Sequence, residues 1–191
     1  MRMKRNKVGG IVVLALGIGV GIAAFWKFRG TIPKGATVVK HFDADKYLGR
    51  WYEIARFDFR FERDLKNTTA NYSLNTDGSI KVVNRGYNVK KRTWEQATGK
   101  AKFSGNTSEG KLMVSFFGPF YSGYNIIALD PNYQYALIAG RNLDYLWLLS
   151  RTPSMPEAVK DNYLQKAKSI GYDTNRLIWV QHDEQNNNPS P

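Results

Sequence analysis

Trp51 and Arg151 are the two residues whose types and spacing say most about the chemistry of this chain. Trp51 lies in the run Gly49-Arg50-Trp51-Tyr52-Glu53, and Arg151 follows about 100 residues later. A guanidinium can lie on an indole ring by a cation–π contact and shield it from water. With Trp51 on the first strand of a sheet and Arg151 at the end of the last, this contact would plug one end of a β-barrel. A barrel closed at one end is a cup for an apolar ligand, so the pair indicates binding rather than catalysis.

The composition gives little support to nucleophilic or metal chemistry. The chain has no cysteine and only two histidines, His41 and His182. No thiol nucleophile, no lipid-bearing cysteine and no His-based metal site or catalytic triad is therefore expected. Glu53 shares the strand face of Trp51; we interpret it as a paired, buried carboxylate, with a ligand contact as the alternative. The sequence thus predicts a protein that is not an enzyme and has no cofactor and no metal.

Aromatic side chains supply the candidate ligand site, since the chain holds 5 Trp, 11 Tyr and 10 Phe. We expect the pocket and its mouth to be formed by Ala55, Phe57, Phe59, Tyr72, Phe103, Phe116, Phe117, Phe120, Tyr124, Tyr145 and Trp147. Basic side chains would edge the mouth at Arg60, Arg63, Lys66, Lys90, Lys91 and Arg92. Such a rim suits an amphiphile with a long tail and an anionic head. The alternative is that the phenylalanines pack in the core and loops and the basic cluster is a solvated edge.

Short alternating segments separated by tight turns predict the architecture. The expected strands are Gly49–Arg60, Asn67–Asn75, Ile80–Asn88, Thr93–Ser104, Lys111–Phe117, Gly123–Leu129, Gln134–Gly140 and Tyr145–Ser150. No helix is expected between them. The sequence therefore predicts an all-β fold, an eight-stranded antiparallel up-and-down barrel with room for one small ligand.

One helix is expected after the barrel, over residues 156–170. Val159, Tyr163, Ala167 and Ile170 form a single apolar stripe, and Gly171 is a typical stop signal. This helix should pack on the outer wall of the barrel. A short ninth strand is expected at Arg176–Gln181, and residues 184–191 form a polar tail that we expect to be disordered.

The N-terminal segment resembles a membrane anchor. Val8–Trp26 is uncharged and, at 1.5 Å per residue, reaches roughly 28 Å, about the thickness of a hydrocarbon core. Of the 28 Lys and Arg residues, seven lie in positions 1–35, which leaves 21 basic against 16 acidic side chains, a net charge of about +5. This mild bias, without a basic helix, argues against a nucleic-acid partner. We favour an uncleaved transmembrane helix, with a cleaved signal peptide as the alternative.

The predicted organisation has four parts. Residues 1–29 form a basic cap and membrane anchor, 30–40 a linker, 41–183 the barrel with its helix, and 184–191 the tail. The excess of basic residues before the apolar segment indicates a barrel exported to the far side of the membrane.

An ordered set of motifs between residues 36 and 182 resembles the lipocalin family, specifically the bacterial (Blc-type) subfamily related to apolipoprotein D. The matching segments include residues 49–56 (GRWYEIAR), 61–63 (FER), 70–74 (ANYSL), 86–88 (GYN), 114–121 (VSFFGPFY), 124–130 (YNIIALD), 144–153 (DYLWLLSRTP) and 178–181 (IWVQ). A single Gly-x-Trp motif would be weak evidence for the resemblance, whereas the whole set of motifs in this order is strong evidence.

The resemblance implies a barrel floor carried by Gly49, Trp51, Asp130 and Arg151. It also implies binding of fatty acids or lysophospholipids, for storage or transport in membrane maintenance, in the bacterial cell envelope. Bacterial members usually carry a lipid on an N-terminal cysteine, and this chain has no cysteine. We therefore expect anchoring in the inner membrane through Val8–Trp26, with the barrel in the periplasm; the outer membrane and a soluble periplasmic form are the alternatives. A homodimer is left open.

Two other functions compete with lipid carriage. A few lipocalin relatives isomerise or de-epoxidise apolar substrates, and Glu53 would then be the general acid or base. A tetrapyrrole carrier is the other alternative. With no His in a strand, its axial ligand would have to be a tyrosine such as Tyr72 or Tyr124.

Overall fold

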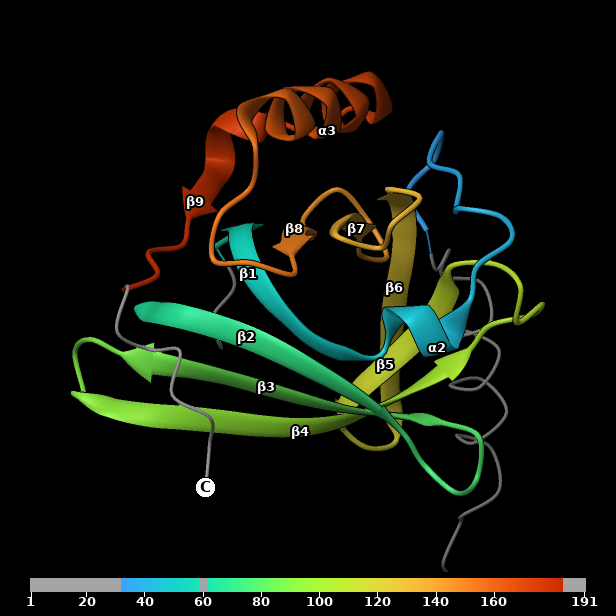
Figure 1. The fold of residues 1–191 in the computed structure, drawn as a ribbon, viewed down its shortest axis with the longest axis horizontal. Coiled ribbons are helices and arrows are strands. Elements are labelled where there is room, and N and C mark those ends of the chain that lie inside the picture. Colours follow the sequence, from blue (N-terminus) through green and yellow to red (C-terminus); the bar gives the residue numbers. More distant parts are fainter. Residues whose placement is uncertain (1–31, 59–61, 184–191) are drawn as a thin grey trace, which may run out of the picture.

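The framework of the protein is a closed antiparallel barrel of eight strands (Figure 1). The computed structural model describes residues 32–58 and 62–183. Its strands are β1 (Gly49–Phe57), β2 (Leu65–Leu74), β3 (Ile80–Asn88), β4 (Thr93–Phe103), β5 (Lys111–Phe117), β6 (Phe120–Leu129), β7 (Tyr135–Ala139) and β8 (Leu146–Ser150). Each strand pairs with the next in sequence, and β1 pairs with both β2 and β8. The predicted up-and-down barrel is therefore correct.

The two ends of the barrel differ. A short helix, α2 (Ala44–Tyr47), precedes β1 and lies at the end that also carries the β2–β3, β4–β5 and β6–β7 connections; we call this end the floor. Asp43 caps α2, because its side chain accepts hydrogen bonds from the backbone amides of Asp45 and Lys46. The β3–β4, β5–β6 and β7–β8 connections lie at the opposite end, which we call the mouth. Sequence analysis missed α2, because one helical turn leaves no periodic pattern.

The barrel wall packs into two apolar clusters, one on each face. The inner cluster contains Phe42, Tyr47, Trp51, Ala70, Tyr72, Ile80, Val82, Ala101, Leu112, Ile126, Ala136, Ile138 and Leu149. The outer cluster contains Ile54, Ala55, Phe57, Ile127, Leu137, Ala139, Leu146, Leu148, Met155, Tyr163, Ala167, Tyr172 and Leu177. Adjacent residues of β7 and β8 alternate between the clusters, as the pleat of a strand requires.

A bulge at Ile54 changes which side of β1 faces the interior. Glu53 pairs with Leu149 of the inner cluster, whereas Ala55 pairs with Leu148 of the outer cluster. One extra residue on β1 therefore shifts the alternation by one position. As a result Ala55 and Phe57 face outward, and Arg56, opposite Trp147, faces inward.

The C-terminal helix α3 (Glu157–Ile170) covers the outer cluster, and Figure 1 shows it lying across the outside of the barrel. Tyr163 and Ala167 of this helix are buried against the barrel, and the Tyr163 hydroxyl donates to the Tyr135 carbonyl (3.0 Å). The helix ends at Gly171, whose φ of 107° is a left-handed conformation that favours glycine. The predicted helix is thus present.

The last described residues, 177–183, complete the wall near the mouth, and we call them the C-terminal seam. After a turn of 3₁₀ helix, η1 (Thr174–Arg176), strand β9 (Leu177–Trp179) pairs with residues 55–57 of β1. β2 pairs only with residues 49–52 of β1. The seam reaches β2 instead, because the Asn67 amide donates to the Gln181 carbonyl (2.8 Å) and Lys66 forms an ion pair with Asp183 (2.7 Å).

The predicted strand limits are close to the observed ones. β3 and β5 match their predicted ranges. β1 ends earlier than expected, at Phe57, and β6 begins earlier, at Phe120. The β6 discrepancy arises because Phe117 and Phe120 pair across a connection that is only Gly118-Pro119.

The expected fold needs one correction, which concerns the predicted transmembrane helix. Among residues 32–58 and 62–183, no helix is both long and apolar enough to cross a membrane. The longest of them, α3, has 14 residues and a largely polar sequence. Val8–Trp26 itself lies outside the described residues.

Candidate ligand-binding site

The floor of the barrel is sealed by Trp51 and Arg151. The Trp51 side chain is fully buried, and its indole N–H donates to the Tyr47 carbonyl (2.9 Å). The Arg151 guanidinium lies 3.9 Å from the centre of the indole ring. At Gly49, with a φ of 91°, a Cβ would lie 3.5 Å from Arg151 Nη1, so the strand begins close against the guanidinium.

Arg151 is held by backbone carbonyls. It donates to those of Arg50 (2.8 Å), Lys46 (2.8 Å) and Tyr133 (3.2 Å), so it ties α2, β1 and the β6–β7 connection together. Asp130 shapes that connection, because its carboxylate accepts from the backbone amides of Asn132, Gln134 and Tyr135. Asp130 therefore positions the Tyr133 carbonyl that receives Arg151.

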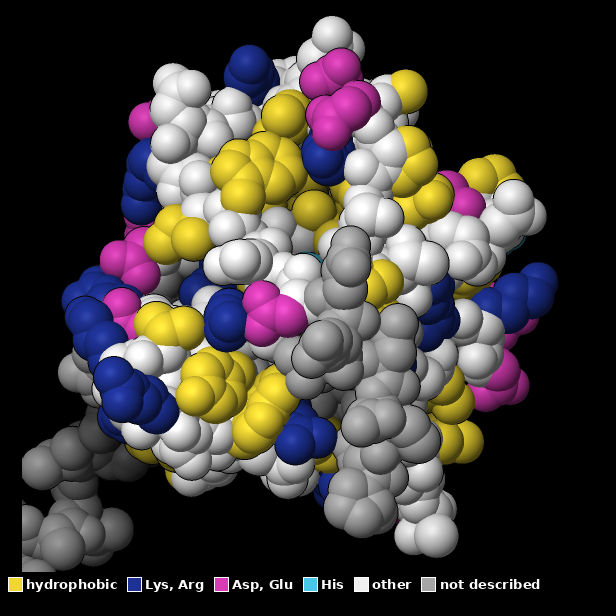
Figure 2. Space-filling model, turned by 60° about the vertical axis from the view of Figure 1, so that its left-hand side comes forward, with side chains coloured by type: hydrophobic (Ala, Val, Ile, Leu, Met, Phe, Trp, Pro, Cys, Tyr) yellow, Lys and Arg dark blue, Asp and Glu magenta, His cyan; other side chains and the backbone are white. Residues whose placement is uncertain are grey.

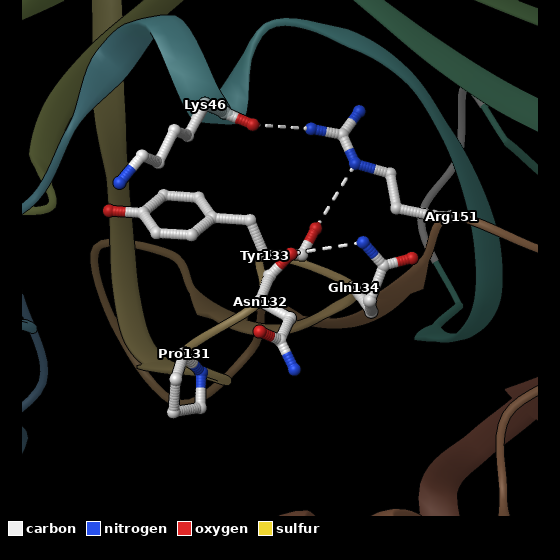
Figure 3. Close-up of a pocket in the computed structure, with 6 residues that line it drawn as sticks. All are labelled: Lys46, Pro131, Asn132, Tyr133, Gln134 and Arg151. Carbon is white, nitrogen blue, oxygen red and sulfur yellow. Dashed lines mark hydrogen bonds between the residues drawn. The ribbon is translucent and has the colours of Figure 1, made fainter.

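A surface cleft of about 400 Å³ lies beneath the floor (Figure 3). It is lined by Lys46, Pro131, Asn132, Tyr133, Gln134 and Arg151. Most of these side chains are exposed, and Arg151 lies between the cleft and Trp51. The cleft is therefore outside the cup.

Three tyrosine hydroxyls meet just above the floor. The Tyr124 hydroxyl lies 2.7 Å from that of Tyr47 and 2.8 Å from that of Tyr72. Burial raises the pKa of all three phenols, so they stay neutral and satisfy one another. This polar contact closes the deepest part of the barrel without a charge.

Above the tyrosines the interior is open. Asn84 and Ala97 pair with one another, and Asn84 pairs with Ala70 of the inner cluster, so both face inward. Ala97 is nevertheless exposed and Asn84 is only partly buried. Inward-facing side chains that remain accessible require free space inside the wall. The mouth half of the barrel is therefore a cup.

An ion-pair network lies on the inner wall between floor and mouth. The buried Arg56 donates from Nη1 to Glu53 (2.8 Å) and from Nη2 to the carbonyls of Glu62 and Leu65. The Glu62 carboxylate accepts from the Trp147 indole (3.2 Å). Burial raises the pKa of Glu53 to about 8, and the neighbouring Glu62 carboxylate adds to this, against the opposing effect of Arg56. Burial raises the pKa of Glu62 as well.

The mouth carries exposed apolar side chains among basic ones. Phe117 and Phe120 are 65% and 62% exposed, and Val89 and Trp94 are also exposed. Lys90 forms an ion pair with Asp64 (2.9 Å) and Lys91 with Glu95 (2.7 Å). Figure 2, in which the β3–β4 connection is turned forward, shows hydrophobic side chains lying between Lys and Arg.

Nine of the eleven predicted pocket residues fall into four groups. Tyr72, Tyr124 and Phe103 lie in the deep inner cluster or pack against it. Phe116 and Trp147 are partly buried on the inner wall, and Tyr145 stacks on Trp147 with 6.1 Å between ring centres. Phe117 and Phe120 lie at the mouth. Phe59 lies outside the described residues, as do Arg60 and Phe61.

Two predicted pocket residues do not reach the cup. Ala55 and Phe57 belong to the outer cluster, where the Phe57 ring contacts Tyr172 and Arg176. The bulge at Ile54 is the reason, because it reverses the alternation on which the prediction depended. The same bulge turns Arg56 to the inside of the barrel. No pattern in the sequence indicated this inward position of Arg56.

Comparison with known proteins shows what kind of barrel this is. The family description "Lipocalin-like domain" matches residues 42–182. The chain belongs to the lipocalin-like family. It is 56% identical over 150 residues to "Outer membrane lipoprotein Blc" of Citrobacter freundii, covering 78% of this chain and 85% of that protein. The same name is carried by a Vibrio cholerae protein that is 48% identical over 151 residues, covering 78% of this chain and 88% of that protein.

More distant similarities are found in sequence and in structure. Apolipoprotein D of Rattus norvegicus is 39% identical over 127 residues, covering 62% of this chain and 66% of that protein. The structure of insecticyanin from the tobacco hornworm Manduca sexta superposes with a TM-score of 0.64 at 21% identity, covering 82% of this chain and 89% of that chain. The structure of lobster apocrustacyanin A1 superposes with a TM-score of 0.63 at 18% identity, covering 82% of this chain and 93% of that chain. These two structures show the same barrel fold at low sequence identity.

Proposed function

We propose that this lipocalin binds fatty acids or lysophospholipids in its cup and stores or transports them in membrane maintenance. The observation that carries the proposal is the accessible inner wall at Asn84 and Ala97 above a floor sealed by Trp51 and Arg151. A cavity with one open end takes up an elongated apolar chain and leaves a polar head at the mouth.

The chemistry of the wall supports an amphiphile with one tail. Phe116, Val114 and Trp147 give the cup apolar sides, and Phe117 and Phe120 extend this surface past the mouth. Burying about ten methylenes at roughly 0.8 kcal/mol each leaves several kcal/mol of net binding after the cost of association. The basic side chains at the rim attract a phosphate or carboxylate head, although each exposed pair contributes little.

The relatives support a place in the bacterial envelope. Two proteins that match most of this chain are named outer membrane lipoproteins. We propose that this lipocalin works on the periplasmic side of the outer membrane. Cell fractionation of the native host, with the protein detected by antibody, tests this location.

We further propose that the site binds without chemical conversion. Glu53, the candidate acid or base, is engaged by Arg56 and buried. Incubating the protein with candidate lipids and following products by mass spectrometry tests this proposal; turnover that Glu53→Gln abolishes without loss of binding would overturn it.

Binding itself is tested by displacement of a fluorescent fatty acid from the full chain. We expect saturable, stoichiometric displacement by palmitate or by 1-palmitoyl lysophospholipid, and native mass spectrometry should show the bound lipid. A failure of every single-tailed lipid to bind saturably would contradict the proposal. Phe116→Ala, at the apolar wall, should weaken binding, and Trp179→Ala, at an exposed position of β9 that pairs with the outward-facing Ala55, should leave it unchanged.

A further inference from the structure

The outer face of β3, β4 and β5 carries lysine and arginine side chains and no acidic one. Alternation defines this face, because Asn84 and Ala97 point into the barrel and their neighbours in sequence therefore point out. The acidic residue of these three strands, Glu95, pairs with Gly86 on the inner side. The outward cations are Lys81, Arg85, Lys100, Lys102 and Lys111.

The cations on this face lie close to one another. Lys81 and Lys100 are directly opposite on β3 and β4, and Lys102 is two residues further along β4. Like charges directly opposite on neighbouring strands repel each other and destabilise a sheet, and a nearby anion offsets the repulsion. Asp77 is one such anion, through an ion pair with Lys100 (2.7 Å). Among the described residues, Lys81, Lys102 and Lys111 form no ion pair, so the face keeps an excess of positive charge.

This face of the barrel is open to solvent. The helix α3 covers the outer cluster, and Figure 1 shows it on the other side of the barrel from β3 and β4. Gln96, Thr98 and Lys102, which point outward on β4, are all exposed. The outward positions of β4 from Trp94 to Lys102 span roughly 27 Å, at about 3.4 Å per residue. The face therefore suits an extended anionic surface better than one small anion.

At its mouth end the basic face continues into apolar side chains. Trp94 is 40% exposed, and the Arg85 guanidinium lies over its ring, 4.4 Å from the ring centre. Val89, which is 46% exposed, and the exposed Arg92 lie in the adjoining β3–β4 connection. Tryptophan favours the boundary between water and lipid, where neighbouring basic side chains contact phosphate groups. This combination matches the headgroup region of a bilayer.

We propose that the outer face of β3–β5, together with the β3–β4 connection, is a docking surface for a lipid bilayer with anionic headgroups. Charge complementarity favours this partner, because such a bilayer presents many negative charges over the length of the face. A nucleic acid also carries phosphates, but Val89 would then stay in water. Docking brings the mouth of the barrel next to the bilayer. The surface lies outside the cup, so this inference does not depend on which ligand the cup holds.

The test uses a fluorophore attached at one chosen position of the full chain, which is possible because the chain has no cysteine. Thr98→Cys places the label on the exposed outer face of β4, and Gln165→Cys places it on the exposed side of α3. The vesicles consist of phosphatidylcholine with or without phosphatidylglycerol, and a nitroxide on the headgroup quenches any label that lies close to the surface. Because two faces of the same barrel are compared, the result holds whatever the rest of the chain contributes to vesicle binding.

We expect the label at position 98 to be quenched about twofold on the anionic vesicles, and the label at position 165 to be quenched little. High salt should remove the quenching at position 98, because it shortens the range of charge interactions. Equal quenching of the two labels would show that the barrel has no preferred face and would overturn the proposal.

Charge reversal tests the cations themselves. Lys81→Glu combined with Lys102→Glu should reduce the quenching at position 98 several-fold. The matched control is Lys166→Glu combined with Lys168→Glu, which makes the same change of charge on α3 and should keep the quenching. If the first double variant does not fold, as judged by circular dichroism, Lys81→Gln combined with Lys102→Gln takes its place and should also lower the quenching.

The remaining outcomes contradict the docking surface. No quenching at position 98 on anionic vesicles, the same quenching on phosphatidylcholine alone, or unchanged quenching in the Lys81 and Lys102 double variant would each overturn it. If a short DNA duplex changes the emission of this label while no vesicle quenches it, the face binds nucleic acid and the proposal is wrong. Lipid uptake into the cup is measured separately by displacement, so failure of one proposal leaves the other to be decided by its own experiment.

Discussion

Arg56 donates a hydrogen bond to Glu53 inside the barrel (2.8 Å), although the two residues are three positions apart on one strand. Residues at an odd separation on a regular strand point to opposite faces. The bulge at Ile54 removes that conflict, because it turns Arg56 to the inner side on which Glu53 already lies. One extra residue therefore places inside the barrel a guanidinium that a regular β1 would have placed outside.

The buried carboxyl of Glu53 makes stability depend on pH. Burial raises its pKa from 4.5 to about 8 in the folded protein, so the folded state keeps a proton that the unfolded chain releases in between. The contribution of the protonated Glu53 carboxyl to the free energy of unfolding is complete below pH 4.5 and is lost as the pH rises through 8. Between about pH 5 and pH 8, we expect the free energy of unfolding to fall less in Glu53→Gln than in the wild type, by about 1 kcal/mol or more.

Urea denaturation at several pH values measures this difference. Glu157→Gln is the control, because the Glu157 side chain is 81% exposed, and its curve should run parallel to that of the wild type. Parallel curves for Glu53→Gln and the wild type would show that Glu53 does not hold the proton.

Arg151→Lys should destabilise the floor. Lysine retains the charge but cannot reach three backbone carbonyls while lying flat on the Trp51 ring. We expect the free energy of unfolding to fall by about 1–3 kcal/mol. Arg50→Lys, at an exposed position beside Trp51, is the control and should change little. Equal stability of the two variants in urea would contradict the sealing role of Arg151.

Substitutions at Phe57 and Phe116 should separate an effect on stability from an effect on lipid binding. Phe57→Leu removes a ring from the outer cluster, so it should lower the melting temperature and leave the lipid affinity of the folded protein unchanged. Phe116→Leu should instead weaken binding with a smaller loss of stability, because Phe116 lies on the accessible inner wall. Calorimetry and displacement titration measure both quantities; a loss of affinity in folded Phe57→Leu would place that ring in the cup after all.

The C-terminal seam should slow hydrogen exchange of the backbone amides at the mouth end of β2. The backbone amide of Asn67 donates to the Gln181 carbonyl (2.8 Å). The Asn67 side-chain amide donates to the Asp183 carboxylate (3.0 Å), and the Asp183 backbone amide donates to the Asn67 side-chain oxygen (2.8 Å). Asp183→Ala should therefore speed hydrogen exchange at residues 65–68. Exchange in β3, which lies away from the seam, should stay at the wild-type rate. Unchanged exchange at Asn67 would show that the seam is held by β9 alone.

Much of the barrel is predictable from the sequence, because alternation and turn residues are local signals. Ile80–Asn88 and Lys111–Phe117 are examples, since turn residues bound each of them. The inner face of β1 was not predictable past Glu53, because a bulge depends on pairing with β8 and leaves no mark in composition. The start of β2 was not predictable for the same reason: the strand shifts register between Lys66 and Thr69, with Asn67 at a φ of 54°.

The way β9 separates β1 from β2 near the mouth has a consequence for biosynthesis. Part of the barrel wall is formed by residues 177–183, whereas the floor depends on Trp51, which lies far earlier in the chain. A polypeptide emerging from its N-terminus can assemble the sealed base well before the side of the cup is complete. The wall of the barrel therefore stays open along that side until residues 177–183 have been synthesised and have folded against β1 and β2.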